Sequence, residues 1–289
     1  MRNILITGKN SYVGTSIEKW LLKSPDNYQI DTLDMKDSSW IEHDFSKYDT
    51  VFHVAGIAHV SSEPDKKDLY YRVNRDLTIE TAKKAKNDGV KQFIFMSSII
   101  VYGASSQVDN ERIIHELIKP EPQDFYGDSK LQAEEGLEEL RDDNFNVVIL
   151  RPPMIYGRNS KGNYPKLAKL ARYTPIFPDI DNKRSMLHID NLSEFVRLMI
   201  VNEEDGLFFP QNKEYVNTKN LVKEIAKLYD HKIIFTKLFN QILVLMSRKV
   251  DLINKVFGDL VYKKEMSKYK ENYRVRDFKE SIRLTEGRD

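Results

Sequence analysis

The fold is decided by one stretch near the start of the chain, Ile4-Leu5-Ile6-Thr7-Gly8-Lys9-Asn10-Ser11-Tyr12-Val13-Gly14. Its apolar half predicts a buried strand, and residues 13–23 show the spacing of an amphipathic helix. Gly8 and Gly14 bracket the turn between them, where glycines permit a tight bend and a close approach of backbone N–H groups to a phosphate. The helix N-terminus attracts the same anion. The stretch therefore predicts a strand–turn–helix unit that can hold a pyrophosphate, although two glycines six residues apart also serve for turning and packing alone.

The rest of the first half repeats the strand–helix alternation. Four further runs are apolar on both faces, as parallel strands covered by helices are: residues 28–34, 51–55, 92–97 and 146–151. Helical spacing separates them at residues 74–88 and 129–141. The alternation predicts an α/β fold with a Rossmann-type, doubly wound parallel sheet. After Pro152-Pro153 the pattern becomes irregular, so we expect an NAD(P)-binding domain over residues 1–155 and a smaller C-terminal lobe over residues 156–289, parts of which return to the sheet.

Composition excludes several classes of protein. Lys and Arg total 45 and Asp and Glu total 44, so the overall charge gives no reason to expect nucleic acid or an anionic membrane as partner. The chain has no cysteine, hence no disulfide or cysteine nucleophile, and none of its six histidines has a recognisable ligand spacing, His53 and His59 included. We therefore expect no metal. With no signal peptide and no apolar run of about 18 residues, we expect a cytoplasmic protein without membrane insertion.

Asp34 is a candidate for cofactor choice. It lies twenty residues after Gly14, at the end of the second predicted strand, where a carboxylate meets the ribose hydroxyls of a bound adenosine. Lys36 follows closely and would instead pair with a 2′-phosphate. NAD and NADP both remain open as cofactors.

Tyr126 and Lys130 are the candidate catalytic pair. Four residues apart on a predicted helix, they share a face. A phenol titrates near 10, and lowering its pKa by about three units needs roughly 4 kcal/mol, most of which one desolvated ammonium can supply. Ser98 follows the strand at 92–97, at the edge where ligands bind, and can polarise the same substrate oxygen. A bare Tyr-x-x-x-Lys usually marks a surface helix. Its place about thirty residues after a serine-ended strand favours a site for proton transfer while hydride moves at carbon.

Together these residues resemble the extended short-chain dehydrogenase/reductases, in particular the nucleotide-sugar epimerase/dehydratase family, over about residues 2–235. The turn resembles the family's three-glycine turn with serine at the middle position, so the side chain there must point away from the cofactor or the pyrophosphate must lie further out. The resemblance implies a set of cofactor-binding residues: Gly8, Ser11, Tyr12, Val13, Gly14, Asp34, Asp44 at the adenine, Ala55 in the wall beside it, Asn74 near the nicotinamide ribose, Tyr126 and Lys130. Ser98, Tyr126 and Lys130 match the family's catalytic serine, tyrosine and lysine.

The resemblance also implies a substrate site in the second half of the chain. Residues 151–157 resemble the segment leading into the sugar site, residues 161–164 resemble a substrate loop that contains Asn163, and residues 184–191 resemble a segment whose arginine, Arg184, contacts a nucleotide diphosphate. An arginine fork suits phosphate oxygens. We expect a nucleotide sugar as substrate, with UDP as the family's commonest carrier, and a homodimer as in relatives.

The reaction is open between two enzymes that act at C4 of the sugar. The 4-epimerases of the family carry Asn where Met154 stands, Lys where Ala58 stands, and an Arg-x-Gly-Asp motif that this chain lacks. The patterns Ala55-x-x-x-His59, residues 97–101 and Arg184-Ser185 are closer to 4-ketoreductases of bacterial surface-polysaccharide pathways. We favour the reductase, keep the UDP-sugar 4-epimerase as the alternative, and rank a non-catalytic NAD(P)-sensing module third because the Tyr/Lys pair is intact.

One further stretch, residues 238–261, has apolar residues at helical spacing with basic residues between them. We expect it to pack on the lobe or against another subunit. Peripheral contact with a membrane is the alternative, although the neutral overall charge does not favour it.

Overall fold

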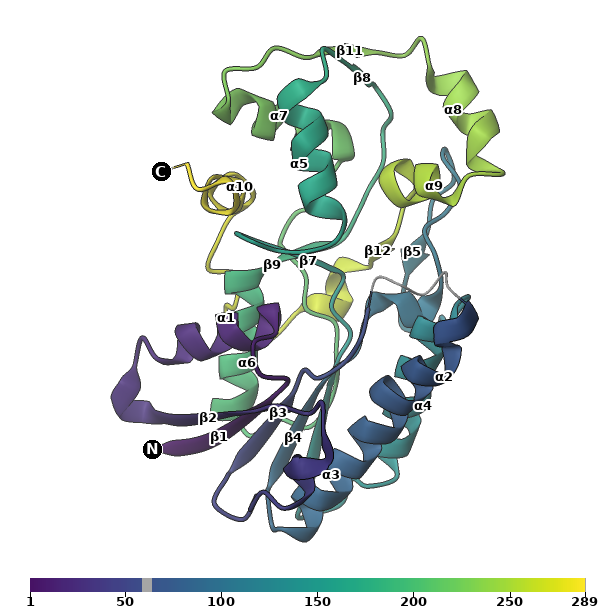
Figure 1. Cartoon of the computed structure of the whole chain (residues 1–289). Coiled ribbons are helices and arrows are strands. Elements are labelled where there is room, and N and C mark those ends of the chain that lie inside the picture. Colours follow the sequence, from purple (N-terminus) through teal and green to yellow (C-terminus); the bar gives the residue numbers. More distant parts are fainter. Residues whose placement is uncertain (59–63, 289) are drawn as a thin grey trace. The chain divides into compact units, whose positions relative to one another are not determined.

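The computed structural model describes residues 1–58 and 64–288, in two compact units (Figure 1). The first unit comprises Met1–Gly103, Lys119–Pro152 and Leu192–Pro210, and the remainder forms the second. We expected a boundary after residue 155, and the chain passes from the first unit to the second after Pro152. Residues 192–210 return to the first unit because they supply a helix and the last strand of its sheet, and residues 104–118 join the second because a short strand in them pairs there. His59, which carried part of the resemblance, lies outside the described residues.

The first unit is built on one six-stranded sheet in which every neighbouring pair is parallel. Its strands, in sheet order, are β10 (Gly206–Phe208), β6 (Asn146–Leu150), β4 (Gln92–Met96), β3 (Thr50–His53), β1 (Arg2–Thr7) and β2 (Tyr28–Leu33). This confirms the predicted Rossmann-type sheet. β10 was not predicted as a strand, and it pairs with β6 at the sheet edge over three residues.

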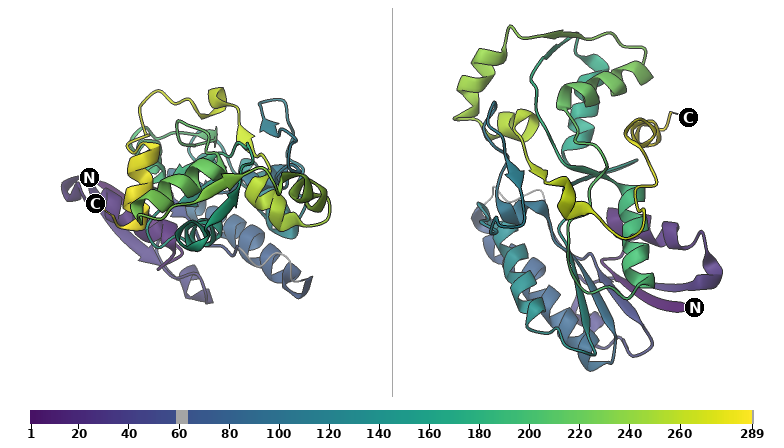
Figure 2. Two further views of the ribbon diagram at one scale, coloured as in Figure 1. Left: turned by 90° about the horizontal axis from the view of Figure 1, so that it is seen from above. Right: turned by 180° about the vertical axis from the view of Figure 1, so that it is seen from behind.

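Helices cover both faces of this sheet. Figures 1 and 2 show α1 (Tyr12–Leu21) and α6 (Ile189–Val201) together on one face, where Trp20 Nε1 donates to Glu194 at 3.0 Å. The opposite face carries α2 (Lys67–Tyr70), the π-helix η4 (Tyr71–Asp76), α3 (Leu77–Asn87) and α4 (Phe125–Glu138). On that face, alternate strand residues such as Phe93 and Phe95 pack against alanines of α3 and α4 in one buried cluster. Small side chains on the helices let them lie close to the sheet.

The second unit has shorter elements. Its helices are α5 (Asn163–Tyr173), α7 (Thr218–Leu228), α8 (Asn240–Ser247), α9 (Asp251–Phe257) and α10 (Phe278–Glu286). Three two-stranded parallel pairs join β5 (Ile113–Ile114) to β12 (Val261–Tyr262), β7 (Met154–Tyr156) to β9 (Met186–His188), and β8 (Ile176–Pro178) to β11 (Ile234–Thr236). A separate apolar core, which includes Tyr156, Tyr164 and Phe177, holds the unit together. Among the described residues no helix is long and apolar enough to cross a bilayer.

Candidate functional site

The order in which the chain adds strands to the sheet reverses between β1 and β3. These strands are neighbours, but the chain leaves β1 toward β2 on one side and leaves β3 toward β4 on the other. Open α/β sheets bind ligands at such a point, beyond the carboxyl ends of the strands. Gly8 follows β1 there with φ of 91°, and a Cβ on it would lie 2.8 Å from the backbone nitrogen of Ala55, just after β3. Glycine is required for this close approach, so the structure brings the predicted Gly8 and Ala55 together at the switch point.

Ser11 caps the helix that follows the turn. Its Oγ accepts a hydrogen bond from the backbone N–H of Gly14 at 3.1 Å, and α1 begins with Tyr12 and Val13. The side chain therefore turns back onto its own helix, as the sequence requires if the position is to leave room for a cofactor. The cap also occupies one of the N–H groups that an anion at this helix end would otherwise receive.

Asp34 lies beside the turn because the carbonyl of Leu33 accepts from the N–H groups of Gly8 and Lys9, at 2.9 and 3.1 Å. Its carboxylate accepts from the backbone N–H of Lys36 at 3.1 Å and lies 3.8 Å from the Lys36 ammonium. The two side chains predicted to distinguish NAD from NADP are thus paired with each other at the surface.

Asp44 lies in a solvent-exposed turn. Its carboxylate accepts from the hydroxyl and the N–H of Ser46 at 2.7 and 2.9 Å, which holds the pKa of this carboxyl below its ordinary value. The adenine contact predicted for Asp44 stays a prediction.

Ser98 and Tyr126 meet at the carboxyl end of β4. Ser98 caps the 3₁₀ turn Ile99–Tyr102 by accepting from the N–H of Ile100 at 3.3 Å, and its side chain is near enough to the Tyr126 phenol to lower the pKa of that group. Tyr126 and Lys130 lie one turn apart on α4, as predicted. This helix begins at Phe125, four residues before the predicted start, because the carboxylate of Asp124 caps it by accepting from the N–H of Gly127 at 2.8 Å.

The acidity of Tyr126 differs from the expectation. Burial raises the pKa of this phenol to about 12, and the hydrogen bond with Ser98 offsets only part of the rise. The ammonium of Lys130 is engaged elsewhere: its Nζ donates to the carbonyl of Met96 at 2.8 Å and lies 4.5 Å from the ring centroid of Phe95. The predicted lowering of this pKa by Lys130 is therefore wrong, and the phenol is held as a proton donor.

Lys130 is itself perturbed. Its side chain is buried, with 5 % of the residue exposed. Burial lowers the pKa of its ammonium to about 8, against a smaller opposing effect of the Glu134 carboxylate. Perturbed ionisable groups of this kind concentrate at functional sites.

Asn74 is fully buried in the π-helix η4 and anchors the segment after β3. Its Oδ1 accepts from the N–H of Ile57 at 2.9 Å, and its Nδ2 donates to the Ile57 carbonyl at 3.1 Å and to Ser129 at 3.3 Å. A Cβ on Gly56 would lie 3.0 Å from this Oδ1 and 3.4 Å from Lys130 Nζ. Asn74, Gly56 and Lys130 thus converge, and π-turns are frequent at functional sites.

A buried ionic network that was not predicted lies behind the predicted catalytic residues. Glu134, one turn beyond Lys130, accepts from Arg151 Nε, which lies 3.1 and 3.0 Å from its two carboxylate oxygens, and from Arg151 Nη2 at 2.5 Å. The side chains of Glu134 and Arg151 are 4 % and 7 % exposed. The Ser97 hydroxyl also donates to Glu134, and Arg151 Nη1 donates to the Tyr102 hydroxyl at 2.7 Å. The spacing of Tyr126, Lys130 and Glu134 along one helix face was an available signal for Glu134.

The residues predicted to bind substrate, Arg184 and Asn163, belong to the second unit. Arg184 Nη1 donates to the Ser105 hydroxyl at 3.1 Å and to the Gly258 carbonyl at 2.9 Å. Burial lowers the pKa of its guanidinium to about 10. Its Nε and Nη2 have no partner among residues 1–58 and 64–288. Asn163 is the first residue of α5, after Gly162 with φ of 95°. Their roles stay predictions.

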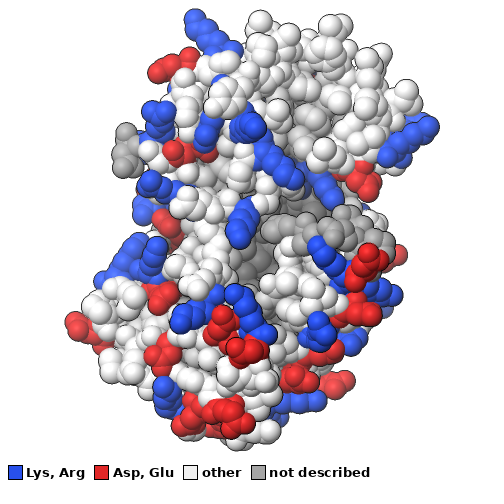
Figure 3. Space-filling model, viewed as in Figure 1, with Lys and Arg blue, Asp and Glu red and all other residues white. Residues whose placement is uncertain are grey.

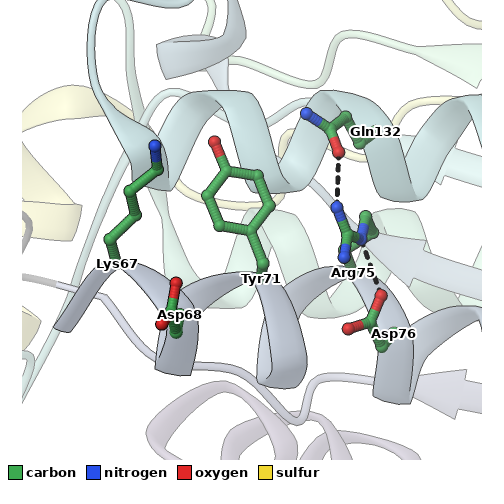
Figure 4. Close-up of a pocket in the computed structure, with 6 residues that line it drawn as sticks. All are labelled: Lys67, Asp68, Tyr71, Arg75, Asp76 and Gln132. Atoms are coloured by element: carbon green, nitrogen blue, oxygen red, sulfur yellow. Dashed lines mark hydrogen bonds and ion pairs between the residues drawn. The ribbon is translucent and has the colours of Figure 1, made fainter.

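A surface pocket in the first unit is lined by none of the predicted site residues. Figure 4 shows its lining: Lys67, Asp68, Tyr71, Arg75, Asp76 and Gln132. Arg75 donates to Gln132 at 2.8 Å and to Asp76 at 2.6 Å. Its charged groups neutralise one another, and none was predicted as a site residue.

Comparison with known proteins identifies a family, and two relatives illustrate the similarity. The sequence profile described as the NAD dependent epimerase/dehydratase family matches residues 4–209. A UDP-glucose 4-epimerase of Vibrio cholerae is 31 % identical over 259 residues, 79 % of this chain and 76 % of that protein. An N-acetyl-α-D-glucosaminyl-diphospho-ditrans,octacis-undecaprenol 4-epimerase of Escherichia coli O157:H7 is 28 % identical over 276 residues, 89 % of this chain and 81 % of that protein.

Solved structures show the same fold at lower identity. A dTDP-4-dehydrorhamnose reductase of Clostridium acetobutylicum matches with a TM-score of 0.75 and 20 % identity, over 99 % of this chain and 98 % of the other. A UDP-glucuronic acid 4-epimerase of Bacillus cereus, in complex with NAD, matches with a TM-score of 0.74 and 17 % identity, over 98 % and 95 %.

Proposed function

The chain belongs to the NAD dependent epimerase/dehydratase family, and on that premise we propose that it is an NAD(P)-dependent oxidoreductase acting at C4 of a sugar carried on a diphosphate. The observation that carries the proposal is the placement of Ser98 beside Tyr126 at the carboxyl end of β4, with Lys130 buried one helix turn away.

The residues at the switch point fit a dinucleotide. Gly8 provides a turn that a Cβ would fill, and Gly56 provides a second such position beside Asn74 and Lys130. We assign Gly8 and residues 11–14 to the pyrophosphate, Asp34 and Asp44 to the adenosine, and Ala55, Asn74 and Lys130 to the nicotinamide half. The bound cofactor supplies or accepts the hydride at the sugar carbon.

The proton steps belong to this chain's own residues. Tyr126 gives its proton to O4 of a 4-keto sugar, while the Ser98 hydroxyl donates a hydrogen bond to the same oxygen and orients the phenol. Lys130 holds the cofactor ribose. Arg184 directs its open guanidinium edge, Nε and Nη2, to the diphosphate, and Asn163 contacts the sugar.

Two net reactions use this chemistry. The 4-ketoreductase is our first choice because Met154, Ala58 and the lack of an Arg-x-Gly-Asp motif depart from the 4-epimerases of the family. The 4-epimerase is the second, and it is favoured by the two curated relatives, both 4-epimerases. The carrier is UDP in our first choice. The E. coli relative, named for an undecaprenyl-diphosphate sugar, makes a polyprenyl diphosphate the second carrier.

Tyr126→Phe tests the mechanism. With a UDP-4-keto-hexose and NADPH we expect turnover to fall by about 10²–10⁴-fold, with dinucleotide affinity, measured by calorimetry, nearly unchanged. Tyr71→Phe is the matched control, since this phenol donates to Asp128 and Tyr71 lines the pocket of Figure 4. Full activity of Tyr126→Phe removes the mechanism.

A second experiment separates the two reactions. An epimerase interconverts UDP-hexoses without added cofactor and releases NAD when the purified protein is denatured. A reductase consumes one NAD(P)H for each 4-keto sugar reduced and leaves UDP-hexoses unchanged.

A further inference from the structure

Helices α8 and α9 carry apolar side chains on two faces. Leu243, Val244, Ile253 and Val256 pack against the core of the second unit. On the other side, between 37 % and 77 % of each residue stays exposed along what we call the α8–α9 face: Leu238, Phe239, Ile242, Leu245, Met246, Val250 and Leu252. Ile242, Leu245 and Met246 form one stripe at helical spacing. Single exposed apolar residues are normal, but seven within fifteen positions mark an interaction surface.

The charge around this face is positive. Residues 232–255 contain five basic side chains (Lys232, Lys237, Arg248, Lys249 and Lys255) and a single acidic one, Asp251. The five basic side chains make no ion pair with any residue that the structure describes. Figure 3 shows the surface over α8 as largely uncharged, with basic side chains at its edge. The neutral charge of the whole chain therefore conceals a local excess of cations beside exposed apolar groups.

We infer that the α8–α9 face docks on an anionic phospholipid surface. Apolar side chains flanked by Lys and Arg match the two components of such a surface, acyl chains beneath anionic headgroups. A second copy of the chain fits less well, because a two-fold interface places the same face on both sides and would bring these cations against one another. Helices of eight and seven residues are too short to span a bilayer, so the contact is interfacial.

The consequence for the proposed function concerns the carrier of the sugar. A face that docks on lipid brings the unit carrying Arg184 and Asn163 to a bilayer, where a sugar on a polyprenyl diphosphate is found. This consequence rests on the proposed function, but the docking itself does not.

Sedimentation with vesicles tests the inference. The full chain should bind vesicles of phosphatidylglycerol mixed with phosphatidylcholine and leave vesicles of phosphatidylcholine alone, and salt should weaken the binding. Arg248→Gln/Lys249→Gln should weaken it by about 30-fold, since each basic side chain contributes about fivefold. Ile242→Ser/Leu245→Ser should weaken it by at least about tenfold.

Matched controls are Lys166→Gln/Lys169→Gln on the exposed side of α5 and Leu117→Ser, a residue 83 % exposed outside the face. Both should bind like the wild type. Equal binding to the two kinds of vesicle, equal loss in the controls, or a change from dimer to monomer in Ile242→Ser/Leu245→Ser by ultracentrifugation would overturn the inference. Turnover of a water-soluble UDP-sugar should stay at the wild-type rate in the face variants, which separates failure of docking from failure of the proposed function.

Discussion

Replacing Lys130 with methionine removes a buried ammonium while keeping a flexible side chain of similar length. Burial lowers the pKa of Lys130 to about 8 from 10.5. One pKa unit corresponds to about 1.4 kcal/mol, so keeping this group protonated in the folded protein at pH 7 costs about 3 kcal/mol. The variant escapes this cost but leaves the Met96 carbonyl without its donor, a loss of about 1 kcal/mol. We expect Lys130→Met to raise the free energy of unfolding by about 2 kcal/mol at pH 7 while it abolishes turnover.

The pH dependence identifies the cause. Below pH 8 the folded and unfolded wild-type chains both hold the Lys130 proton, so the advantage of the variant is constant. Between pH 8 and 10.5 the folded wild type has released the proton and the unfolded chain has not. Wild-type stability therefore rises with pH by up to about 1.4 kcal/mol per unit relative to the variant, and the variant's advantage is lost.

Urea denaturation followed by circular dichroism at pH 7, 8, 9 and 10 measures both effects. Lys83→Met on the exposed side of α3 is the control and should show no pH-dependent difference from the wild type. A Lys130→Met variant that is less stable than the wild type at pH 7, or whose difference from it is constant up to pH 10, would refute the reasoning.

Three other substitutions have effects of known direction. Glu134→Gln leaves the Arg151 cation buried without a counter-ion and should lower the free energy of unfolding by about 3–5 kcal/mol in urea titrations, and adding Arg151→Met should restore part of the loss. His53 is fully buried, and burial lowers the pKa of its imidazole to about 3. Unfolding therefore takes up a proton below pH 6.5, and the free energy of unfolding decreases by up to about 1.4 kcal/mol for each unit by which the pH is lowered. His53→Gln should make this decrease smaller in acid denaturation. Ser11→Gly should cost only a few tenths of a kcal/mol in stability and should tighten dinucleotide binding in calorimetry, since it frees the Gly14 N–H; unchanged or weaker binding would count against the cap as an obstacle.

The sequence was sufficient where a feature is local. The strand–turn–helix unit at residues 4–14 and the pairing of Tyr126 with Lys130 on one helix follow from spacing alone, and both are present. Helix α4 begins four residues before its predicted start because Asp124 caps its N-terminus.

Features that depend on distant partners were not accessible in the same way. Glu134 and Arg151 come together only because β4 and β6 are neighbours in the sheet. Spacing along the chain indicates Glu134, on the helix face of Lys130, but does not indicate Arg151 as its partner. The high pKa of Tyr126 is caused by burial of its phenol, and the Lys130 ammonium that was expected to lower it donates to the Met96 carbonyl. A sequence shows which groups share a helix face, but the acceptor that each group finds is a property of the folded core.

The predicted catalytic pair, Tyr126 and Lys130, shares helix α4 with Glu134 of the buried network. Tyr126, Lys130 and Glu134 follow one another at four-residue spacing on the same face. Glu134 accepts from Ser97, the neighbour of Ser98, and binds Arg151, the residue after β6, so α4 is fixed to the carboxyl ends of two strands. Glu134 also raises the pKa of Lys130 against the larger effect of burial. Loss of its carboxylate should therefore move the alkaline limb of the pH–rate profile to lower pH as well as reduce kcat, whereas a purely structural defect would reduce kcat with the profile unchanged.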